Sequence, residues 1–169
     1  MRTRLPHDWR AAANHEPRKG GKLPDMLLLH YTGMKTAEAA INWLASAESQ
    51  VSCHYVIDEQ GRITQMVSEV ERAWHAGVSQ FCGREKCNDF SIGIELEGDG
   101  DTPFTNEQYA SLAEVTGVLL KKYPDLQFAG HSDIAPERKT DPGPSFDWVR
   151  LTKIAKLSEE KLPFGSASR

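Results

Sequence analysis

Two histidines stand directly after apolar runs that are typical of buried strands. His30 follows residues 26–29, and His131 follows residues 126–130. The end of a strand is a common position for binding groups in sheet proteins. Imidazole nitrogens bind transition metals, so both histidines are candidate ligands. Each one taken alone is equally well explained as a hydrogen-bonded structural histidine.

A second group of polar residues follows His131 within ten positions. It contains Lys139 and Asp141, and Pro142 favours an extended backbone at the residue before it. Side chains two positions apart in an extended segment point to the same side. The pattern therefore predicts an ammonium and a carboxylate side by side near a histidine. The alternative is a surface loop that carries a Lys–Asp ion pair.

A strand predicted over residues 91–96 carries a further carboxylate. Apolar and polar side chains alternate along it, which places Gly93, Glu95 and Glu97 on one face. Either glutamate has the chemistry of a general base, and Gly93 leaves room for a substrate beside Glu95. The simplest interpretation of Glu97 is a solvated carboxylate at the end of the strand.

These residues come from distant segments, so a scaffold has to bring them together. Thr36 and Thr105 are predicted helix N-caps, the second with the capping-box partner Gln108. A Gly turn at 60–61 predicts a hairpin. Strands are predicted over residues 26–29, 51–58, 62–67, 91–96 and 126–129, and helices over residues 37–46, 106–123 and 148–157. Strands that interleave with helices predict an α/β fold with a central mixed β-sheet flanked by helices.

The 169 residues fit a single domain with one core. A polar arm without periodicity is predicted over residues 1–24, the folded domain over 25–160 and a C-terminal tail over 161–169. Residues 72–87 are rich in turn positions and are predicted to form a long loop.

The composition limits the partners. The net charge is −4 and the basic residues are scattered, which argues against nucleic acid. No apolar stretch approaches the roughly 18 residues that cross a bilayer. The three cysteines do not form the even set of a disulfide framework, and no apolar segment follows Arg2 and Arg4 as a secretory signal requires. We expect a monomeric cytoplasmic protein that acts on a small or neutral molecule.

Five segments together resemble the AmpD-type N-acetylmuramoyl-L-alanine amidases. They are residues 29–33, 51–55, 72–77, 88–95 and 130–144, in the order of that family. The resemblance implies the fold shared with peptidoglycan-recognition proteins. It also implies that His30, His131 and Asp141 bind Zn²⁺, that Glu95 is the general base and that Lys139 stabilises the transition state.

Four residues are candidate substrate contacts: Trp74, His75, Arg84 and Asn88. The first two suit a sugar ring, and Arg84 suits a peptide carboxylate. Alternatives are a turn residue for Asn88 and a solvated loop charge for Arg84. His54 lies in a predicted strand and is better explained as a core histidine or as support for the site.

The function implied by the resemblance is hydrolysis of the amide between (1,6-anhydro-)N-acetylmuramic acid and L-alanine, in the recycling of muropeptides. About twenty residues separate His30 from Val51, fewer than in AmpD relatives, which leaves an amidase of intact peptidoglycan as an alternative. A non-catalytic peptidoglycan-binding module, a zinc peptidase that cuts the stem peptide, and a structural protein with an incidental metal site are the other interpretations.

Overall fold

The computed structural model describes residues 7–162, and its centre is a six-stranded sheet in the order β1-β5-β4-β9-β3-β10. The strands are β1 (Asp8–Trp9), β3 (Met26–Tyr31), β4 (Tyr55–Ile57), β5 (Ile63–Gln65), β9 (Ser91–Leu96) and β10 (Gln127–Gly130). β4 and β5 form the predicted antiparallel hairpin, and the other neighbouring pairs are parallel. The prediction of a mixed sheet is confirmed.

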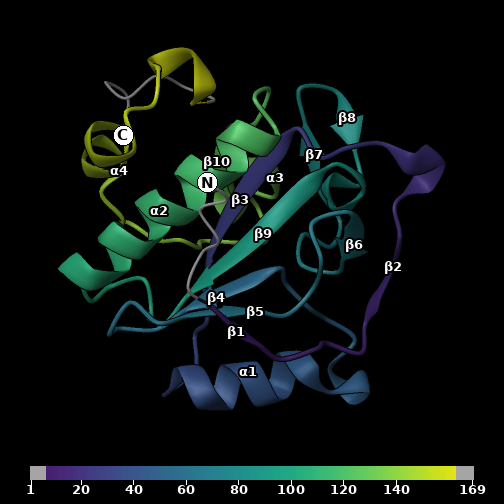
Figure 1. Cartoon of the computed structure of the whole chain (residues 1–169), viewed down its shortest axis with the longest axis horizontal. Coiled ribbons are helices and arrows are strands. Elements are labelled where there is room, and N and C mark those ends of the chain that lie inside the picture. The colour runs from purple at the N-terminus through teal and green to yellow at the C-terminus, as the bar shows by residue number, and fades with distance from the viewer. Residues whose placement is uncertain (1–6, 163–169) are drawn as a thin grey trace.

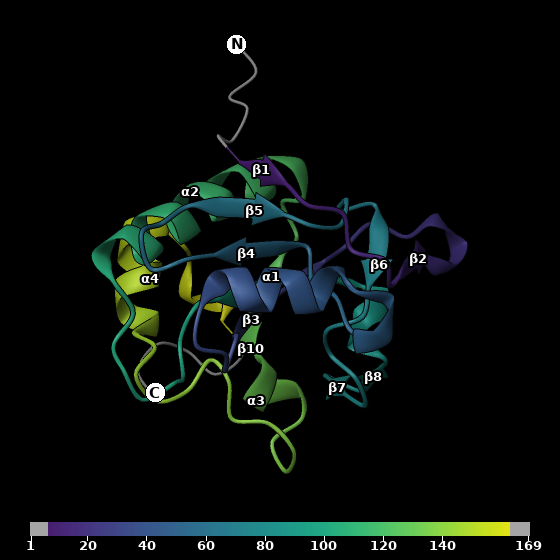
Figure 2. The ribbon, with the colours of Figure 1, turned by 90° about the horizontal axis from the view of Figure 1, so that it is seen from below.

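Helices cover both faces of this sheet. They are α1 (Ala37–Ala45), α2 (Asn106–Lys122), α3 (His131–Ile134) and α4 (Trp148–Ala155). α2 and α4 pack on one face, and Figure 1 shows α2 in front of β3 and β10. α1 packs on the opposite face, where Figure 2 shows it lying over β4. Beside α1 the second face is covered by α3 and by residues 76–90, whose apolar side chains pack with Met26 and Leu28.

The helix ends confirm the capping predictions. The Thr36 hydroxyl accepts a hydrogen bond from the Ala39 amide at 3.1 Å. At α2 the Thr105 hydroxyl accepts from the Gln108 amide while the Gln108 side chain accepts from the Thr105 amide. These bonds satisfy amides that have no partner inside the helix. α4 begins after Asp147, one of the two predicted caps.

The central strand β3 is apolar on both faces. Leu27 and Leu29 face α2, whereas Met26 and Leu28 face the other side of the sheet. His30 is next in this alternation, so its side chain points to the side that α2 does not cover. In the register of β3 and β9, His30 pairs with Glu95. The sheet thus positions both side chains on the face opposite α2.

The described part of the predicted N-terminal arm, residues 7–24, is paired with strands of the folded domain. Its β1 pairs with β5, and β2 (His15–Pro17) pairs with β6 (Glu71–Ala73). Arg18 is only 5% exposed, and its guanidinium donates hydrogen bonds to the carbonyls of Glu69, Asn88, Asp89 and Ser91. Residues 1–6 and 163–169, the outer parts of the predicted arm and tail, lie outside the described residues.

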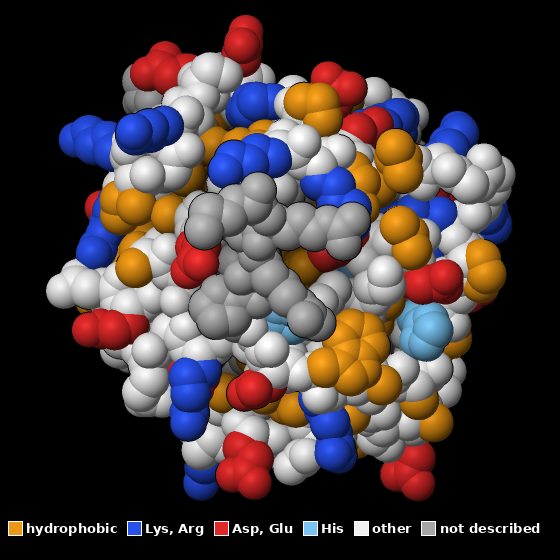
Figure 3. Space-filling model, viewed as in Figure 1, with side chains coloured by type: hydrophobic (Ala, Val, Ile, Leu, Met, Phe, Trp, Pro, Cys, Tyr) orange, Lys and Arg blue, Asp and Glu red, His pale blue; other side chains and the backbone are white. Residues whose placement is uncertain are grey.

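The predicted loop over 72–87 also contains short pairings. β7 (Gln80–Phe81) and β8 (Arg84–Glu85) form a small antiparallel ribbon. All three cysteines are free thiols. Within residues 7–162 no helix has the length and apolar character needed to cross a membrane. On the face seen in Figure 3, basic and acidic side chains are interspersed, as the scattered charge of the sequence predicts.

Candidate metal centre and active site

Three side chains meet where β3 and β10 end. The Nδ1 atoms of His30 and His131 lie 3.0 Å apart, and Asp141 Oδ2 lies 2.8 Å from the first and 3.1 Å from the second. All three residues are buried. The structure therefore brings together the three predicted ligands, which are called the metal centre below.

Local structure explains this meeting. β10 pairs in parallel with β3, with Gly130 opposite Leu29, so the two histidines follow at neighbouring positions. The Ser132 amide donates to the Asp141 carbonyl at 2.9 Å, which folds the loop back onto α3. A Cβ at position 130 would lie 2.6 Å from Pro142 Cδ, so only glycine allows this close return.

The geometry fits a divalent metal ion. His131 Nε2 lies 2.9 Å from the Ala76 carbonyl, which can only accept, so Nε2 carries the hydrogen and Nδ1 presents its lone pair. Burial lowers the pKa of His30 to about 4, which keeps that ring neutral. Metal–ligand bonds of about 2.0–2.1 Å in a tetrahedral site place ligand atoms about 3.3 Å apart, close to the separations seen here.

Glu95 adds a carboxylate without a partner. Its Oε2 is buried and has no hydrogen-bond partner among residues 7–162. Burial is the main reason why its pKa rises to about 8; the Asp141 charge also raises it and the Lys139 charge lowers it. A carboxyl with such a pKa accepts and releases protons near neutral pH, as a general base must.

A cleft opens above these groups. A cavity of about 410 Å³ is lined by the metal centre, Glu95, Lys139 and Trp74, with α1 forming one wall. A neighbouring hollow of about 950 Å³ also contacts Trp74 and Lys139 and extends towards residues 77–80. The predicted catalytic residues thus share one cleft that is long enough for an extended ligand.

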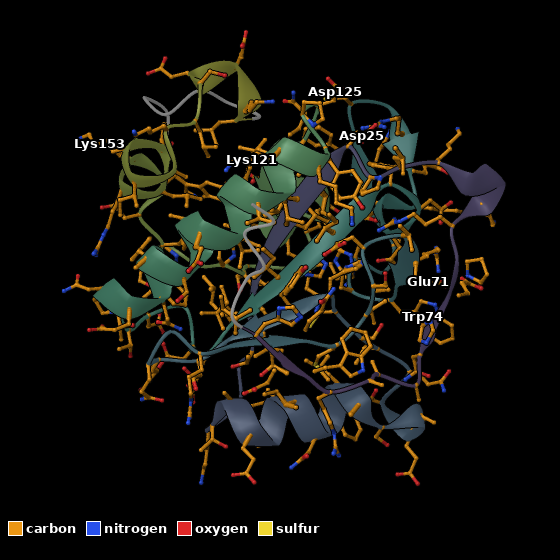
Figure 4. The ribbon with its side chains drawn as sticks, in the orientation of Figure 1. Asp25, Glu71, Trp74, Lys121, Asp125 and Lys153 are labelled. Carbon is orange, nitrogen blue, oxygen red and sulfur yellow. The ribbon has the colours of Figure 1, made fainter. Side chains whose placement is uncertain are left out.

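Trp74 and His75 differ in their surroundings. Trp74 lines both hollows. Figure 4 labels it next to Glu71 at the right of the view, away from α4, which carries the labelled Lys153 at the left. His75 is only 9% exposed, and its ring lies against Gly93, where a Cβ would be 2.5 Å from the ring. The space predicted for substrate beside Gly93 is therefore filled by His75.

The other two predicted contacts have protein partners. Asn88 Oδ1 accepts from the amides of His75 and Ala76, at 3.0 and 2.7 Å. Arg84 pairs with Asp25 at 2.7 Å. Asp25, labelled in Figure 4, precedes β3. It is five residues from His30, which is roughly 16 Å of strand. The structure does not bring Arg84 to the metal centre, and its contact with substrate stays a prediction.

The two remaining candidates are structural. Glu97 is not a solvated carboxylate, because its oxygens accept from the amides of Ala37 and Glu59 at 2.7 and 2.9 Å. It caps α1, whose position beside the strand end could not be inferred from the sequence. His54 is fully buried, and its Nδ1 accepts from the Gly93 amide at 3.0 Å. The interpretation of His54 as a core histidine is confirmed.

Two supporting groups were missed by sequence reasoning. The Ala76 carbonyl accepts from His131 and also from Arg138 Nη2 at 2.8 Å. A backbone carbonyl carries no signal in the residue type. Arg138 lies next to Lys139, and this proximity was the one available hint.

Comparison with known proteins identifies the class. Residues 20–144 match the family model described as N-acetylmuramoyl-L-alanine amidase. The chain is 40% identical to the 1,6-anhydro-N-acetylmuramyl-L-alanine amidase AmpD of Enterobacter cloacae over 93% of this chain and 97% of that protein. Identity to the AmpD of Haemophilus influenzae is 55% over 112 residues, 64% of this chain and 61% of that protein. The chain therefore belongs to the N-acetylmuramoyl-L-alanine amidase family and is an enzyme of this class.

Solved structures agree on the fold. A crystal structure of an AmpD selenomethionine derivative matches with a TM-score of 0.77 and 39% identity, over 88% of this chain and 93% of that one. AmpDh3 from Pseudomonas aeruginosa, solved in complex with anhydromuramic pentapeptide, matches with a TM-score of 0.71 and 31% identity, over 91% of this chain and 66% of that one.

Proposed function

We propose that this protein is a zinc-dependent amidase that hydrolyses the bond between 1,6-anhydro-N-acetylmuramic acid and the L-alanine of the stem peptide, in muropeptide recycling. The observation that carries the proposal is the convergence of two imidazole nitrogens and one carboxylate oxygen within 3.1 Å, beside a buried glutamate oxygen without a partner. The names of the AmpD relatives and the ligand of AmpDh3 support the choice of substrate.

The donor set favours zinc among the divalent metals. Two neutral imidazoles and one carboxylate are a common ligand set of catalytic zinc, with a fourth position left for water. When bound, Zn²⁺ supplies a water whose pKa is about 7 and a Lewis acid for the scissile carbonyl. His30, His131 and Asp141, which line the cavity of about 410 Å³, would hold the ion.

Glu95 and Lys139 have separate roles in the proposed reaction: proton transfer and stabilisation of negative charge. Glu95 takes a proton from the attacking water through the unpartnered Oε2, as the water oxygen bonds to the carbonyl carbon. It then delivers the proton to the alanine nitrogen, and the C–N bond breaks. The Lys139 ammonium, which lines the same cavity, pairs with the negative charge that develops on the carbonyl oxygen. Trp74 offers an aromatic face to the substrate at the wall of the cleft.

The test is incubation of the purified protein with 1,6-anhydro-muropeptide and, separately, with intact peptidoglycan, with products identified by mass spectrometry. We expect free stem peptide from the anhydro-muropeptide, loss of activity with a chelator and recovery with Zn²⁺. Faster release from intact peptidoglycan would replace recycling by wall remodelling. Cleavage inside the stem peptide would refute the amidase assignment.

A recycling role also predicts where the enzyme works. Muropeptides are recycled inside the cell, so we infer a cytoplasmic enzyme, which acts as a monomer on a neutral or small ligand. Cell fractionation and light scattering test these two expectations. Recovery of the enzyme from the periplasm or the medium would contradict the recycling role.

A further inference from the structure

A line of buried hydrogen bonds leads away from the metal centre through His75. His30 Nε2 lies 3.0 Å from His75 Nδ1, and His75 Nε2 lies 3.2 Å from Ser91 Oγ. Ser91 Oγ lies 2.6 Å from the Cys87 carbonyl oxygen. We propose that His75 is a positioning residue, which acts through this line of bonds to fix the tautomer of His30 and leave its Nδ1 free for metal. The inference rests on the proposed zinc dependence.

The Cys87 carbonyl sets the direction of every bond in the line. A carbonyl only accepts, so the single hydroxyl hydrogen of Ser91 points to it. The Ser91 oxygen is then an acceptor for His75, whose Nε2 must carry the hydrogen. A neutral His75 therefore has its lone pair on Nδ1 and accepts from His30 Nε2. A neutral His30 is left with a lone pair on Nδ1, which faces the metal centre.

One short segment orients both histidine ligands. The His75 side chain accepts from His30, and the carbonyl of the next residue, Ala76, accepts from His131. Asn88 holds this segment by accepting from both of its amides. A hydrogen on either Nδ1 would occupy the position where the ion binds. Support of this kind typically changes metal affinity by about 10–100-fold.

Burial separates this role from substrate contact. The His75 ring is enclosed between His30, His54 and the bare backbone at Gly93, with ring centroids 5.1 and 5.7 Å from the two histidines. Both of its nitrogens are engaged by protein groups. A ring in this position has no free polar atom to offer a sugar or a peptide.

The first test uses the Asp141→Ala variant without metal, because the ionised Asp141 carboxylate lies 2.8 Å from His30 Nδ1 and would itself hold a hydrogen there once the metal is removed. Long-range ¹H–¹⁵N correlation spectra of ¹⁵N-histidine-labelled protein distinguish the two neutral tautomers of each ring. We expect His30, His75 and His131 all to carry hydrogen on Nε2. Hydrogen on Nδ1 of His30 would overturn the proposal, and this result does not depend on whether the enzyme uses zinc.

The second test measures Zn²⁺ affinity by competition with a chromophoric chelator. His75→Phe keeps a ring over Gly93 but removes the acceptor, and we expect binding to weaken about 10–100-fold. His75→Asn restores an acceptor close to the position of Nδ1 and should recover most of this loss. Affinity within about twofold of wild type in His75→Phe would refute the role of His75.

A pair of hydroxyl deletions provides the matched control. Ser91→Ala removes the link to Cys87 and should weaken Zn²⁺ binding several-fold. Thr116→Val also deletes a buried hydroxyl, but this one lies in α2 and has no hydrogen-bond partner in the described part of the chain, so affinity should not change. Equal effects of the two variants would mean that general loosening, rather than the line of bonds, changes affinity. Absence of Zn²⁺ binding by the wild-type protein, together with the expected tautomers in Asp141→Ala, would refute the zinc dependence and keep the inference on His75.

Discussion

Two buried polar centres lie close together in this protein, and they differ in how their hydrogen-bond donors and acceptors are matched. In the Arg18 centre, formed by Arg18 and His54, the guanidinium donates to four backbone carbonyls and the imidazole accepts from the Gly93 amide. In the metal centre, acceptor atoms face each other. The rings of His54 and His75 are 5.7 Å apart, so both centres share one environment.

The contrast between the two centres gives a criterion that separates structural from functional polar groups. Burial of an unmatched polar group costs free energy, so a matched set such as the Arg18 centre is explained by folding alone. A set of buried polar groups without hydrogen-bond partners is not explained by folding alone. The acceptors of the metal centre and the free oxygen of Glu95 are the features from which we propose a bound cation and a reacting proton. Four predictions, in order of decreasing effect, test this contrast.

Loss of a ligand should abolish function. Asp141→Ala removes the only carboxylate of the metal centre, so we expect loss of stoichiometric Zn²⁺ and a fall in kcat/KM of about 10⁴-fold or more. Metal content by atomic emission and product release by mass spectrometry measure both effects. Asp125→Ala, at an exposed position, is the control and should change neither. Retention of zinc by Asp141→Ala would contradict the ligand assignment.

Loss of the base should separate chemistry from metal binding. Glu95→Gln keeps the shape but cannot take a proton, so kcat should fall about 10²–10⁴-fold while zinc stays bound. Glu97→Gln, directly after the end of the same strand, is the matched control. Because Glu97 caps α1, this substitution should lower stability more than turnover. Near-normal turnover in Glu95→Gln would make another group the base.

Disruption of the Arg18 centre should affect stability instead. Arg18→Met keeps the buried volume and removes the donors, which leaves several carbonyls without partners. We expect the free energy of unfolding to fall by about 3 kcal/mol, with little change in Zn²⁺ affinity of the folded protein. Urea denaturation measures this loss, and exposed Arg10→Met is the control. A large loss of Zn²⁺ affinity without a loss of stability in Arg18→Met would contradict the purely structural role of the Arg18 centre.

The pH dependence of the metal-free protein gives the smallest effect. The pKa of Glu95 is raised to about 8 in the folded protein, above its usual 4.5. The carboxyl therefore contributes stability that is fully present below about pH 4.5 and is lost as the pH rises through about 8. With a chelator present, the free energy of unfolding of Glu95→Gln should increase relative to that of the wild type as the pH rises from 5 to 8.5. Glu114→Gln, on the exposed side of α2, should show no such gain. A constant difference would place Glu95 in a more solvated site.

Much of the scaffold was predictable because its signals are local. The apolar run of β3, the alternation of β9 and the caps Thr36 and Thr105 each lie within a few residues. The metal centre was predictable because the loop that carries Asp141 has a distinctive pattern and because the five segments resemble a known family. These features depend on residue type and spacing, which a sequence contains directly.

The supporting shell was not predictable, because its partners are backbone groups of distant segments. Arg18 gains its role from carbonyls as far as 73 positions away. His75 suggested a sugar contact because the sequence does not reveal that Ser91 and the Cys87 carbonyl lie behind it. Glu97 suggested a solvated end of a strand because the start of α1 beside it is set by tertiary packing.

The parallel pairing of β3 has a consequence for the growing chain on the ribosome. Its neighbour β9 is made roughly 65 residues later, and β10 later still. At about 5–20 residues per second, the most apolar strand waits several seconds with both edges unpaired. Exposed apolar strand edges recruit other chains, so this interval is the period of greatest aggregation risk. A shielding chaperone, or slow release of residues 26–31 from the exit tunnel, would protect the nascent enzyme during it.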